Sequence, residues 1–163
     1  MNRNLIRKTV LAASIACVAV LAGPARAAGT YAAGLGISSQ PGVSKVFDFL
    51  AVQRSATTLS ALGEAFLAQR DSTGVFGDFS LVGKVVCLRV TGKHAVMGLV
   101  IQHGTGTAAG HEGEAFYMVG DDNRALGVPD TFDNSGYTGT TTADCNYEQG
   151  TAGVVTKGDV TVH

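Results

Sequence analysis

Two histidines and two glutamates form the densest group of side chains in this sequence that could carry chemistry. They are His103, His111, Glu112 and Glu114, and their imidazole and carboxylate groups suit zinc or copper. His103 and His111 flank a loop of glycine, threonine and alanine over residues 104–110, so a hairpin would bring them together at its neck. His103, His111 and Glu114 are therefore candidate metal ligands. The spacing fixes no fourth ligand, and solvated loop residues are the alternative interpretation.

A second group of side chains, rich in carboxylates, lies between residues 121 and 134. Asp121, Asp122, Asp130 and Asp133 are candidate ligands for calcium, which binds oxygen atoms. The segment departs from the helix–loop–helix calcium motif, because two apolar residues, at positions 125 and 126, stand where that motif needs an oxygen ligand and a glycine. Turn formation is the alternative, since aspartate and asparagine favour turns.

Patterns typical of nucleophilic catalysis or phosphate binding are missing from the sequence. There is no Gly-x-Ser-x-Gly nucleophile motif. The run Gly104-x-Gly106-x-x-x-Gly110 lacks the lysine and the following helix of a phosphate-binding loop. We therefore predict no catalytic residues and no cofactor, and a protein that is not an enzyme is the favoured interpretation.

The first 27 residues have the three parts of a secretory signal peptide. Basic residues at positions 3, 7 and 8 precede the apolar run Thr9–Leu21, and Ala25-Arg26-Ala27 supplies the small residues of a cleavage site. The apolar run is too short for a transmembrane helix, which needs roughly 20 residues. The sequence therefore predicts export by a cleaved signal peptide to the periplasm or the extracellular medium, with no transmembrane segment in the mature chain.

The chain after residue 27 is acidic. Four of the twelve lysines and arginines lie in the signal segment and none of the thirteen acids does, so the remainder carries a net charge of −5. Its basic residues are scattered singly and form no stripe that would follow a phosphate backbone. Nucleic acid and anionic membrane surfaces are therefore not expected partners, and the sequence names no other.

Cys87 and Cys145 are the only cysteines after the signal segment. Two cysteines in an oxidising compartment usually pair. Closing their separation of 58 residues would stabilise the fold by roughly 4 kcal/mol on the chain-entropy model. Two separately buried thiols are the alternative. Lipidation of Cys17 is a rival interpretation of the signal segment, but Ser14 stands where lipoprotein signals usually carry a bulky aliphatic residue.

The composition after residue 27 is typical of short strands joined by tight turns. Valine, threonine and phenylalanine recur in short runs between glycines. Residues 28–44 are small and glycine-rich without a period, which predicts a flexible leader, and residues 45–163 form a single β domain. The expected fold is all-β: a small antiparallel β-barrel or closed sandwich with one disulfide.

Residues 80–103 predict a β-hairpin around the two-residue loop Gly92-Lys93, which fits a type II′ turn. Facing Thr91 with His94 then pairs Cys87 with Gly98 and Val86 with Leu99. Gly98 leaves room beside Cys87 for Cys145 to approach. Both faces of the hairpin are mainly apolar, so the sheet is expected to close on itself or to be covered.

Further strands are predicted on either side of the hairpin. Residues 46–53 place Phe47, Phe49 and Ala51 on one face of a strand and four mainly apolar side chains on the other. Residues 114–121 form another strand, and short strands are expected around 131–132, 137–141 and 153–163. Residues 55–70 are ambiguous, because Leu59, Leu62 and the residues 66–67 fall at helical spacing, which slightly favours a helix.

Several motifs resemble a loose group of uncharacterised exported bacterial β-barrel-like domains. They are Phe47-x-Phe49, Gly83-x-Val85-x-Cys87-Leu88-x-Val90-x-Gly92-x-x-Ala95, Gly113-x-Ala115-Phe116, Pro129-Asp130-x-Phe132, Cys145 and the closing Gly158-Asp159-Val160-Thr161-Val162-His163. The resemblance covers residues 45–163. It implies an antiparallel barrel-like domain with one disulfide and a strand over residues 62–70, and it brings no activity with it.

Three functions remain open at this point. The leading expectation is a noncatalytic, envelope-associated or extracellular binding or structural domain. The second is a carrier that holds a small ligand in the interior of the barrel, which requires a lined cavity of roughly 300 Å³ or more. The third is a metal-assisted hydrolase, which requires His103, His111 and Glu114 to converge.

Overall fold

The computed structural model describes residues 29–55, 57–147 and 153–163, and this part of the chain is built from strands. The strands are β1 (Tyr31–Gln40), β2 (Val43–Ser55), β3 (Thr58–Asp71), β4 (Phe79–Thr91), β5 (His94–Gly106), β6 (Ala115–Asp121), β7 (Thr131–Asn134) and β8 (Gly153–Val162). A short 3-10 helix, η2 (Arg124–Leu126), lies between β6 and β7. The predicted signal peptide, residues 1–27, lies outside the described residues.

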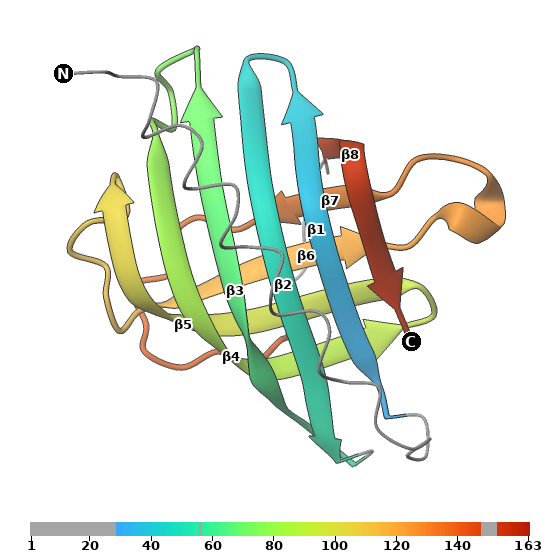
Figure 1. Cartoon of the computed structure of the whole chain (residues 1–163). Coiled ribbons are helices and arrows are strands. Elements are labelled where there is room, and N and C mark those ends of the chain that lie inside the picture. Colours follow the sequence, from blue (N-terminus) through green and yellow to red (C-terminus); the bar gives the residue numbers. More distant parts are fainter. Residues whose placement is uncertain (1–28, 56, 148–152) are drawn as a thin grey trace, which may run out of the picture.

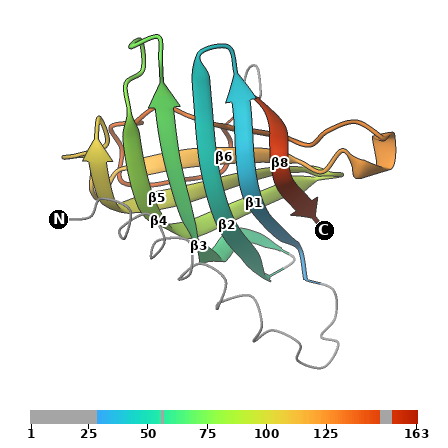
Figure 2. The ribbon, with the colours of Figure 1, turned by 45° about the horizontal axis from the view of Figure 1, so that its top comes forward.

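The eight strands form one antiparallel sheet that closes in a ring (Figure 1). Each strand pairs with its neighbours in the sequence, and β1 also pairs with β8, which joins the two ends of the sheet. The first strands run across the last ones, so the ring is seen as two crossed layers (Figures 1 and 2). The expected all-β class, with a closed antiparallel sheet and one disulfide, is confirmed.

The inside of the ring is packed with apolar side chains. On β2 the side chains at alternate positions point inward, as the pattern predicts, and Phe47, Phe49 and Ala51 are all buried. The aromatic ring of Phe47 stacks inside the closed sheet on that of Phe132 from β7, with centroids 4.1 Å apart. The interior is therefore a filled core along most of its length.

Strand β1 replaces the flexible leader expected over residues 28–44. It pairs with β2 from Tyr31 to Gln40 and closes the ring against β8. Its glycines are required by packing: a Cβ on Gly34 would lie 2.6 Å from the ring of Phe49. Small residues that suggest a linker in the sequence thus make room for the large side chains of β2.

Residues 58–71 form the long strand β3, so the helix favoured by spacing alone does not form there. Ala61, Ala65 and Leu67 point into the ring, whereas Leu62 and Phe66 point out. The strand that the resemblance implied for residues 62–70 is confirmed. Apolar residues stand on both faces of this strand. Taken together, the inward-facing and outward-facing residues recur every three to four positions, which resembles the spacing of a helix.

The predicted hairpin is present, with one irregularity. Thr91 pairs with His94 and Cys87 with Gly98, as expected. Gly92 has a positive φ of 64°, which a turn beginning with glycine needs. A bulge at Val86 then shifts the register, so that Val85 rather than Val86 pairs with Leu99. The short strand expected around residues 137–141 does not form.

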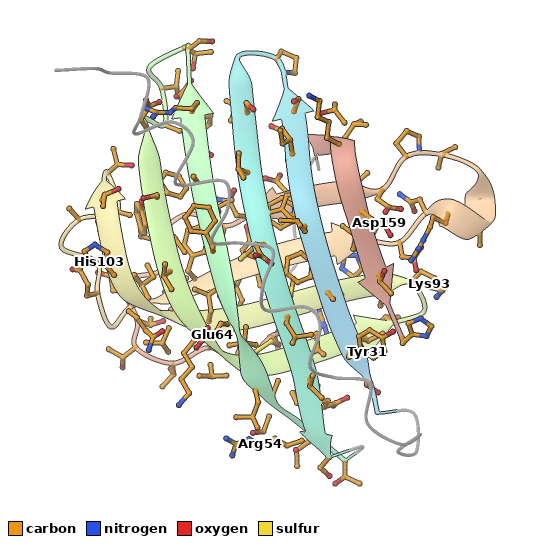
Figure 3. All side chains as sticks on the ribbon, in the orientation of Figure 1. Tyr31, Arg54, Glu64, Lys93, His103 and Asp159 are labelled. Atoms are coloured by element: carbon orange, nitrogen blue, oxygen red, sulfur yellow. A yellow bond between two sulfur atoms is a disulfide. The ribbon has the colours of Figure 1, made fainter. Side chains whose placement is uncertain are left out.

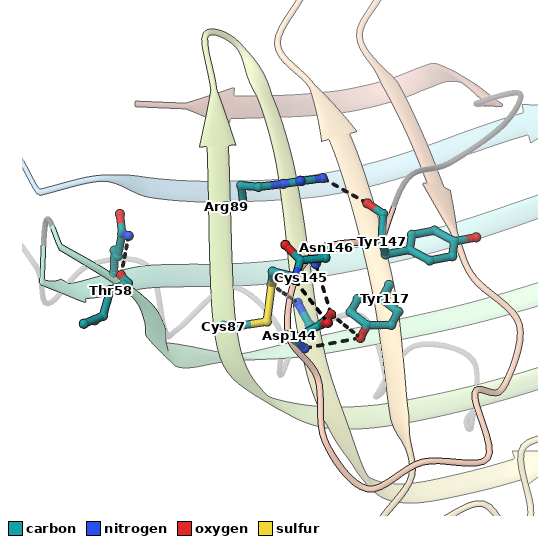
Figure 4. Close-up of a disulfide and its surroundings, with 10 residues drawn as sticks. Thr58, Cys87, Arg89, Tyr117, Asp144, Cys145, Asn146 and Tyr147 are labelled. Carbon is teal, nitrogen blue, oxygen red and sulfur yellow. Dashed lines mark hydrogen bonds between the residues drawn. A yellow bond between two sulfur atoms is a disulfide. The ribbon is translucent and has the colours of Figure 1, made fainter.

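The segment after β7 crosses the outside of the hairpin and is fixed there by the disulfide between Cys87 and Cys145 (Figure 4). Gly98 provides the room, because its own Cβ would lie 2.5 Å from the Cys87 sulfur, and its backbone N–H donates to the Cys145 sulfur at 3.1 Å. Tyr147 stacks on Tyr117 of β6 with ring centroids 5.0 Å apart. This crossing covers the outer apolar face of β5 and β6.

The outer face of β1 to β3 has no comparable cover among the described residues. The exposed apolar side chains there are Leu35, Val46, Leu50, Val52, Leu62 and Phe66. Asp48 lies among them on β2, and burial raises the pKa of its carboxyl above the ordinary value. The described residues contain no helix of the length and apolarity needed to span a membrane.

Candidate ligand-binding site

A cavity of about 440 Å³ opens at one end of the ring. This end is formed by the β1–β2 turn, the β3–β4 loop, the end of β5 and the segment that follows β7; the first two of these lie at the top of Figure 1. The residues that line the cavity are Gln40, Val43, Lys45, Gln69, Val75, Phe76, Phe79, Thr107, Phe116, Asp133, Asn134, Ser135, Gly136 and Tyr137. We call this space the mouth cavity.

A buried ion pair between Lys45 and Asp133 lies at the mouth cavity. Lys45 is in the same inward-facing set of β2 residues as Phe47 and Phe49, and it is 6 % exposed. Asp133, on β7, is 7 % exposed and also accepts hydrogen bonds from Gln40 Nε2 and from the backbone N–H of Asn134. Charged side chains are rarely this buried unless they are paired, so the pair is a specific feature of this end.

The Lys45 ammonium has donor capacity that the described residues leave unused. It carries three N–H donors, and Asp133 is its only hydrogen-bond partner among the described residues. Ser38, which lies opposite Lys45 in the β1–β2 register, has a buried hydroxyl without a hydrogen-bond partner in the described part of the chain. Of these two residues Lys45 lines the cavity, and a ligand with an oxygen acceptor would use its spare donors.

One wall of the mouth cavity is aromatic. Phe79 lies edge-on to Phe116 and to Tyr137, with ring centroids 6.3 and 6.2 Å apart. His111 stacks on Tyr137 with ring centroids 4.0 Å apart. Burial raises the pKa of the Tyr137 hydroxyl, so this ring stays a neutral phenol at ordinary pH. The wall presents flat apolar surface to the cavity.

The β3–β4 loop forms the rim of the cavity and is held by Asp71. The Asp71 carboxylate accepts hydrogen bonds from the backbone N–H groups of Thr73, Phe76 and Gly77 and from the Thr73 hydroxyl. The hydroxyl and then these N–H groups lower the pKa of Asp71. The loop presents Val75 and Phe76, which are 74 % and 66 % exposed, beside the cavity.

The candidate metal ligands do not come together. His111 Nδ1 lies 3.0 Å from Glu114 Oε1, but Glu112 turns to the backbone N–H groups of Gly104 and Gly110. His103 is exposed on the outer edge of β5, at the side of the molecule away from Lys93 and Asp159 (Figure 3). Within the described ranges no three His, Cys, Asp or Glu side chains form a group that could hold a metal ion.

The four candidate calcium ligands do not form one cation site among the described residues. Asp121 accepts from Thr131 and contacts His94, and Asp130 accepts from the backbone N–H groups of Asn123 and Val160. Asp133 pairs with Lys45 at the mouth cavity. Asp133 is thus at the mouth cavity, whereas the other three lie at the β6–β7 connection, where their oxygens bind protein donors, and no three of the described carboxylates form a group that could hold a metal ion.

Asp122 is at the opposite end of the ring from the mouth cavity, next to the β4–β5 turn. It accepts from Arg124 Nε at 3.1 Å, from Lys93 Nζ at 3.4 Å and from the backbone N–H of Val162 at 3.5 Å. The Arg124 hydrogen bond is the main cause that lowers the pKa of Asp122 to about 2. The Lys93 ammonium also donates to the carbonyl of Val162 at 2.8 Å, and its side chain is half exposed, so its remaining donor can reach solvent.

Asp133 is among the residues predicted from sequence, whereas its partner Lys45 is not. One signal in the sequence points to Lys45. It alternates with Val43, Phe47 and Phe49, so it is the one charged residue at an inward-facing position of that strand. The pattern is visible only if the strand begins before Lys45, as it does at Val43. Local sequence does not predict that Asp133 of β7 pairs with Lys45, because 88 residues separate these two side chains.

Comparison of this chain with protein-family models, with curated proteins and with solved structures finds no significant match in any of the three.

Proposed function

We propose that this protein is a noncatalytic, exported domain that binds a small molecule in the mouth cavity. The observation that carries the proposal is the coincidence of a cavity of about 440 Å³ with a buried ammonium that has donors to spare. Ligand sites are typically concave, mostly apolar and supplied with a few polar groups that fix orientation. The mouth cavity has these three properties.

The site differs from the carrier expected from sequence, in which the ligand lies inside the barrel. The core fills the ring around Phe47, Phe116 and Phe132, so space for a ligand is at the end of the ring. A ligand could enter the mouth cavity from solvent without any opening of the closed sheet. This position favours reversible exchange with the surrounding solution over sequestration.

Export of the domain is part of the proposal. The disulfide between Cys87 and Cys145 is compatible with an oxidising compartment, in which such bonds form and persist. The signal-peptide pattern of residues 1–27 supports the same location. An envelope-associated or extracellular domain of this kind would meet its ligand outside the cytoplasm.

A cavity-filling variant tests this function. A Cβ on Gly136 meets nothing within 4 Å, so Gly136→Trp places a large side chain at the cavity with no backbone clash. In a heteronuclear NMR screen of the oxidised protein with small aromatic compounds, we expect saturable shifts at Lys45 and Ser135, lost in Gly136→Trp and retained in Gly136→Ala. Saturable shifts confined to residues outside the cavity, or none, would contradict the proposal.

A further inference from the structure

We infer that the molecule bound in the mouth cavity is uncharged and largely apolar, with a ring-sized body and one oxygen acceptor, such as a carbonyl, that hydrogen-bonds to Lys45. This inference rests on the proposed function and adds the chemical class of the ligand. It follows from three properties of the cavity: the donors it offers, the charge it already holds and the shape of its apolar wall.

The unused N–H donors of Lys45 determine the polar end of the ligand. The Lys45 ammonium is buried, donates to Asp133 and has no other hydrogen-bond partner among the described residues. An ammonium offers donors and no acceptor, so the group that completes it must be an acceptor. A hydrogen bond from a charged donor is stronger than one between neutral groups, which favours an oxygen placed at this point.

The charge already present argues against a charged ligand. Among the described residues that line the cavity, Lys45 and Asp133 are the only Lys, Arg, His, Asp or Glu side chains, and they neutralise each other. An anion at Lys45 would approach the Asp133 carboxylate, whereas a cation would find that both Asp133 oxygens already accept from protein donors. The desolvation free energy of a ligand with a net charge would therefore exceed the free energy gained from its new interactions in this buried place.

The apolar wall defines the body of the ligand. Phe79, Phe116 and Tyr137 present ring surface on one side, and Phe76 stands exposed at the rim. Aromatic rings pack well against such surfaces in offset or edge-on arrangements. A cavity of about 440 Å³ accepts a molecule of one to three rings, which is in the usual range for small-ligand sites.

Four matched probes test the class of ligand. Naphthalene, 2-acetylnaphthalene, 2-naphthoate and 2-naphthylmethylamine share one ring system and differ in the polar group: none, a neutral carbonyl, an anion and a cation. Each is titrated against the oxidised protein at pH 7, and the dissociation constant is taken from NMR shifts of the cavity residues. We expect the ketone to bind about tenfold more tightly than each of the other three, as one charge-assisted hydrogen bond allows.

The variants separate Lys45 from general packing. Lys45→Met/Asp133→Asn removes both charges together, so it leaves no unpaired ion in the fold, and it should abolish the preference for the ketone over naphthalene. Lys84→Met, on the outer face of β4, removes one lysine charge away from the cavity and should leave the preference unchanged.

Each outcome has a distinct meaning. Tightest binding of 2-naphthoate or of the amine, equal binding of all four probes, or a ketone preference that survives Lys45→Met/Asp133→Asn would overturn the ligand class and leave the proposed function standing. Saturable binding of none of the four probes in the cavity would count against the proposed function itself, and the ligand class would fall with it.

Discussion

Asp133 and Asp122 are buried carboxylates at opposite ends of the ring, and each contacts a lysine. At the Asp122 end, Arg124 also binds the carboxylate, and the Lys93 ammonium donates a second hydrogen bond to the carbonyl of Val162. At the Asp133 end, the lysine is the more deeply buried of the two and lies beside a cavity with donors unused. Both ends thus bury a carboxylate, and the mouth cavity differs by having unused hydrogen-bond donors next to open space, which is why we propose the ligand site there.

The disulfide, which lies at neither of these two sites, should contribute most to the free energy of unfolding. Replacing both cysteines, Cys87→Ala/Cys145→Ala, should lower the free energy of unfolding by about 4 kcal/mol, because the bond closes a long loop in the unfolded chain. Urea denaturation measures the loss. Probe affinity at the mouth cavity should stay within twofold in the folded variant, since the disulfide lies outside the ring. A loss of affinity equal to that in Lys45→Met/Asp133→Asn would show that the two regions are not independent.

Removing the cation at the mouth cavity should have the next largest effect. Lys45→Met leaves the Asp133 carboxylate buried without its counter-ion, which should cost about 3 kcal/mol of folding free energy. The double variant with Asp133→Asn should recover most of this loss. Equal stability of the single and double variants in urea titrations would mean that the two side chains do not interact as a pair.

The contribution of Asp122 to the free energy of unfolding should depend on pH. The folded-state pKa of Asp122, about 2, is below its ordinary value of 3.8, so its contribution is complete above about pH 4 and is lost as the pH falls through 2. Asp122→Asn should lower stability at pH 7 by about 2 kcal/mol, the scale of hydrogen bonds to a charged group. Urea midpoints of the two proteins should converge between pH 4 and 2. A difference that stays constant over this range would contradict the assignment.

The smallest effect on stability should come from the rim residue Phe76. This side chain is largely exposed, so Phe76→Ala should change the free energy of unfolding by no more than about 0.5 kcal/mol. It should still weaken probe binding several-fold, because Phe76 lines the cavity. Leu126→Ala is the matched control, because Leu126 is also a largely exposed apolar residue, on η2 at the opposite end. Unchanged probe affinity in Phe76→Ala would remove the rim from the site.

Part of this fold is predictable from local sequence. The hairpin of residues 80–103 has a clear glycine turn and alternating valines, so its register follows as far as the Cys87–Gly98 pair. The glycine that makes room for the disulfide was predictable for the same reason. The bulge at Val86 was not, because it depends on which side chains the rest of the ring buries.

Other parts depend on contacts between distant residues. The glycines of β1 suggest a linker, and only the phenylalanine rings of β2 explain them. The apolar residues on both faces of β3 suggest a helix until the neighbouring strands are known. In the site, the histidines and glutamates stood out by density in the sequence, whereas the pair that lines the cavity joins one residue of β2 to one of β7. Polar residues that are close together in the sequence were thus not the ones that come together in the fold.

A crystal structure of the oxidised protein with 2-acetylnaphthalene would show whether Lys45 binds a carbonyl in the mouth cavity. We expect the ring system between Phe76, Phe116 and Tyr137, with the carbonyl oxygen about 3 Å from Lys45 Nζ. A probe bound in the cavity with its carbonyl turned toward solvent would contradict the role of Lys45. A probe bound elsewhere on the protein, with the cavity unchanged, would contradict the site.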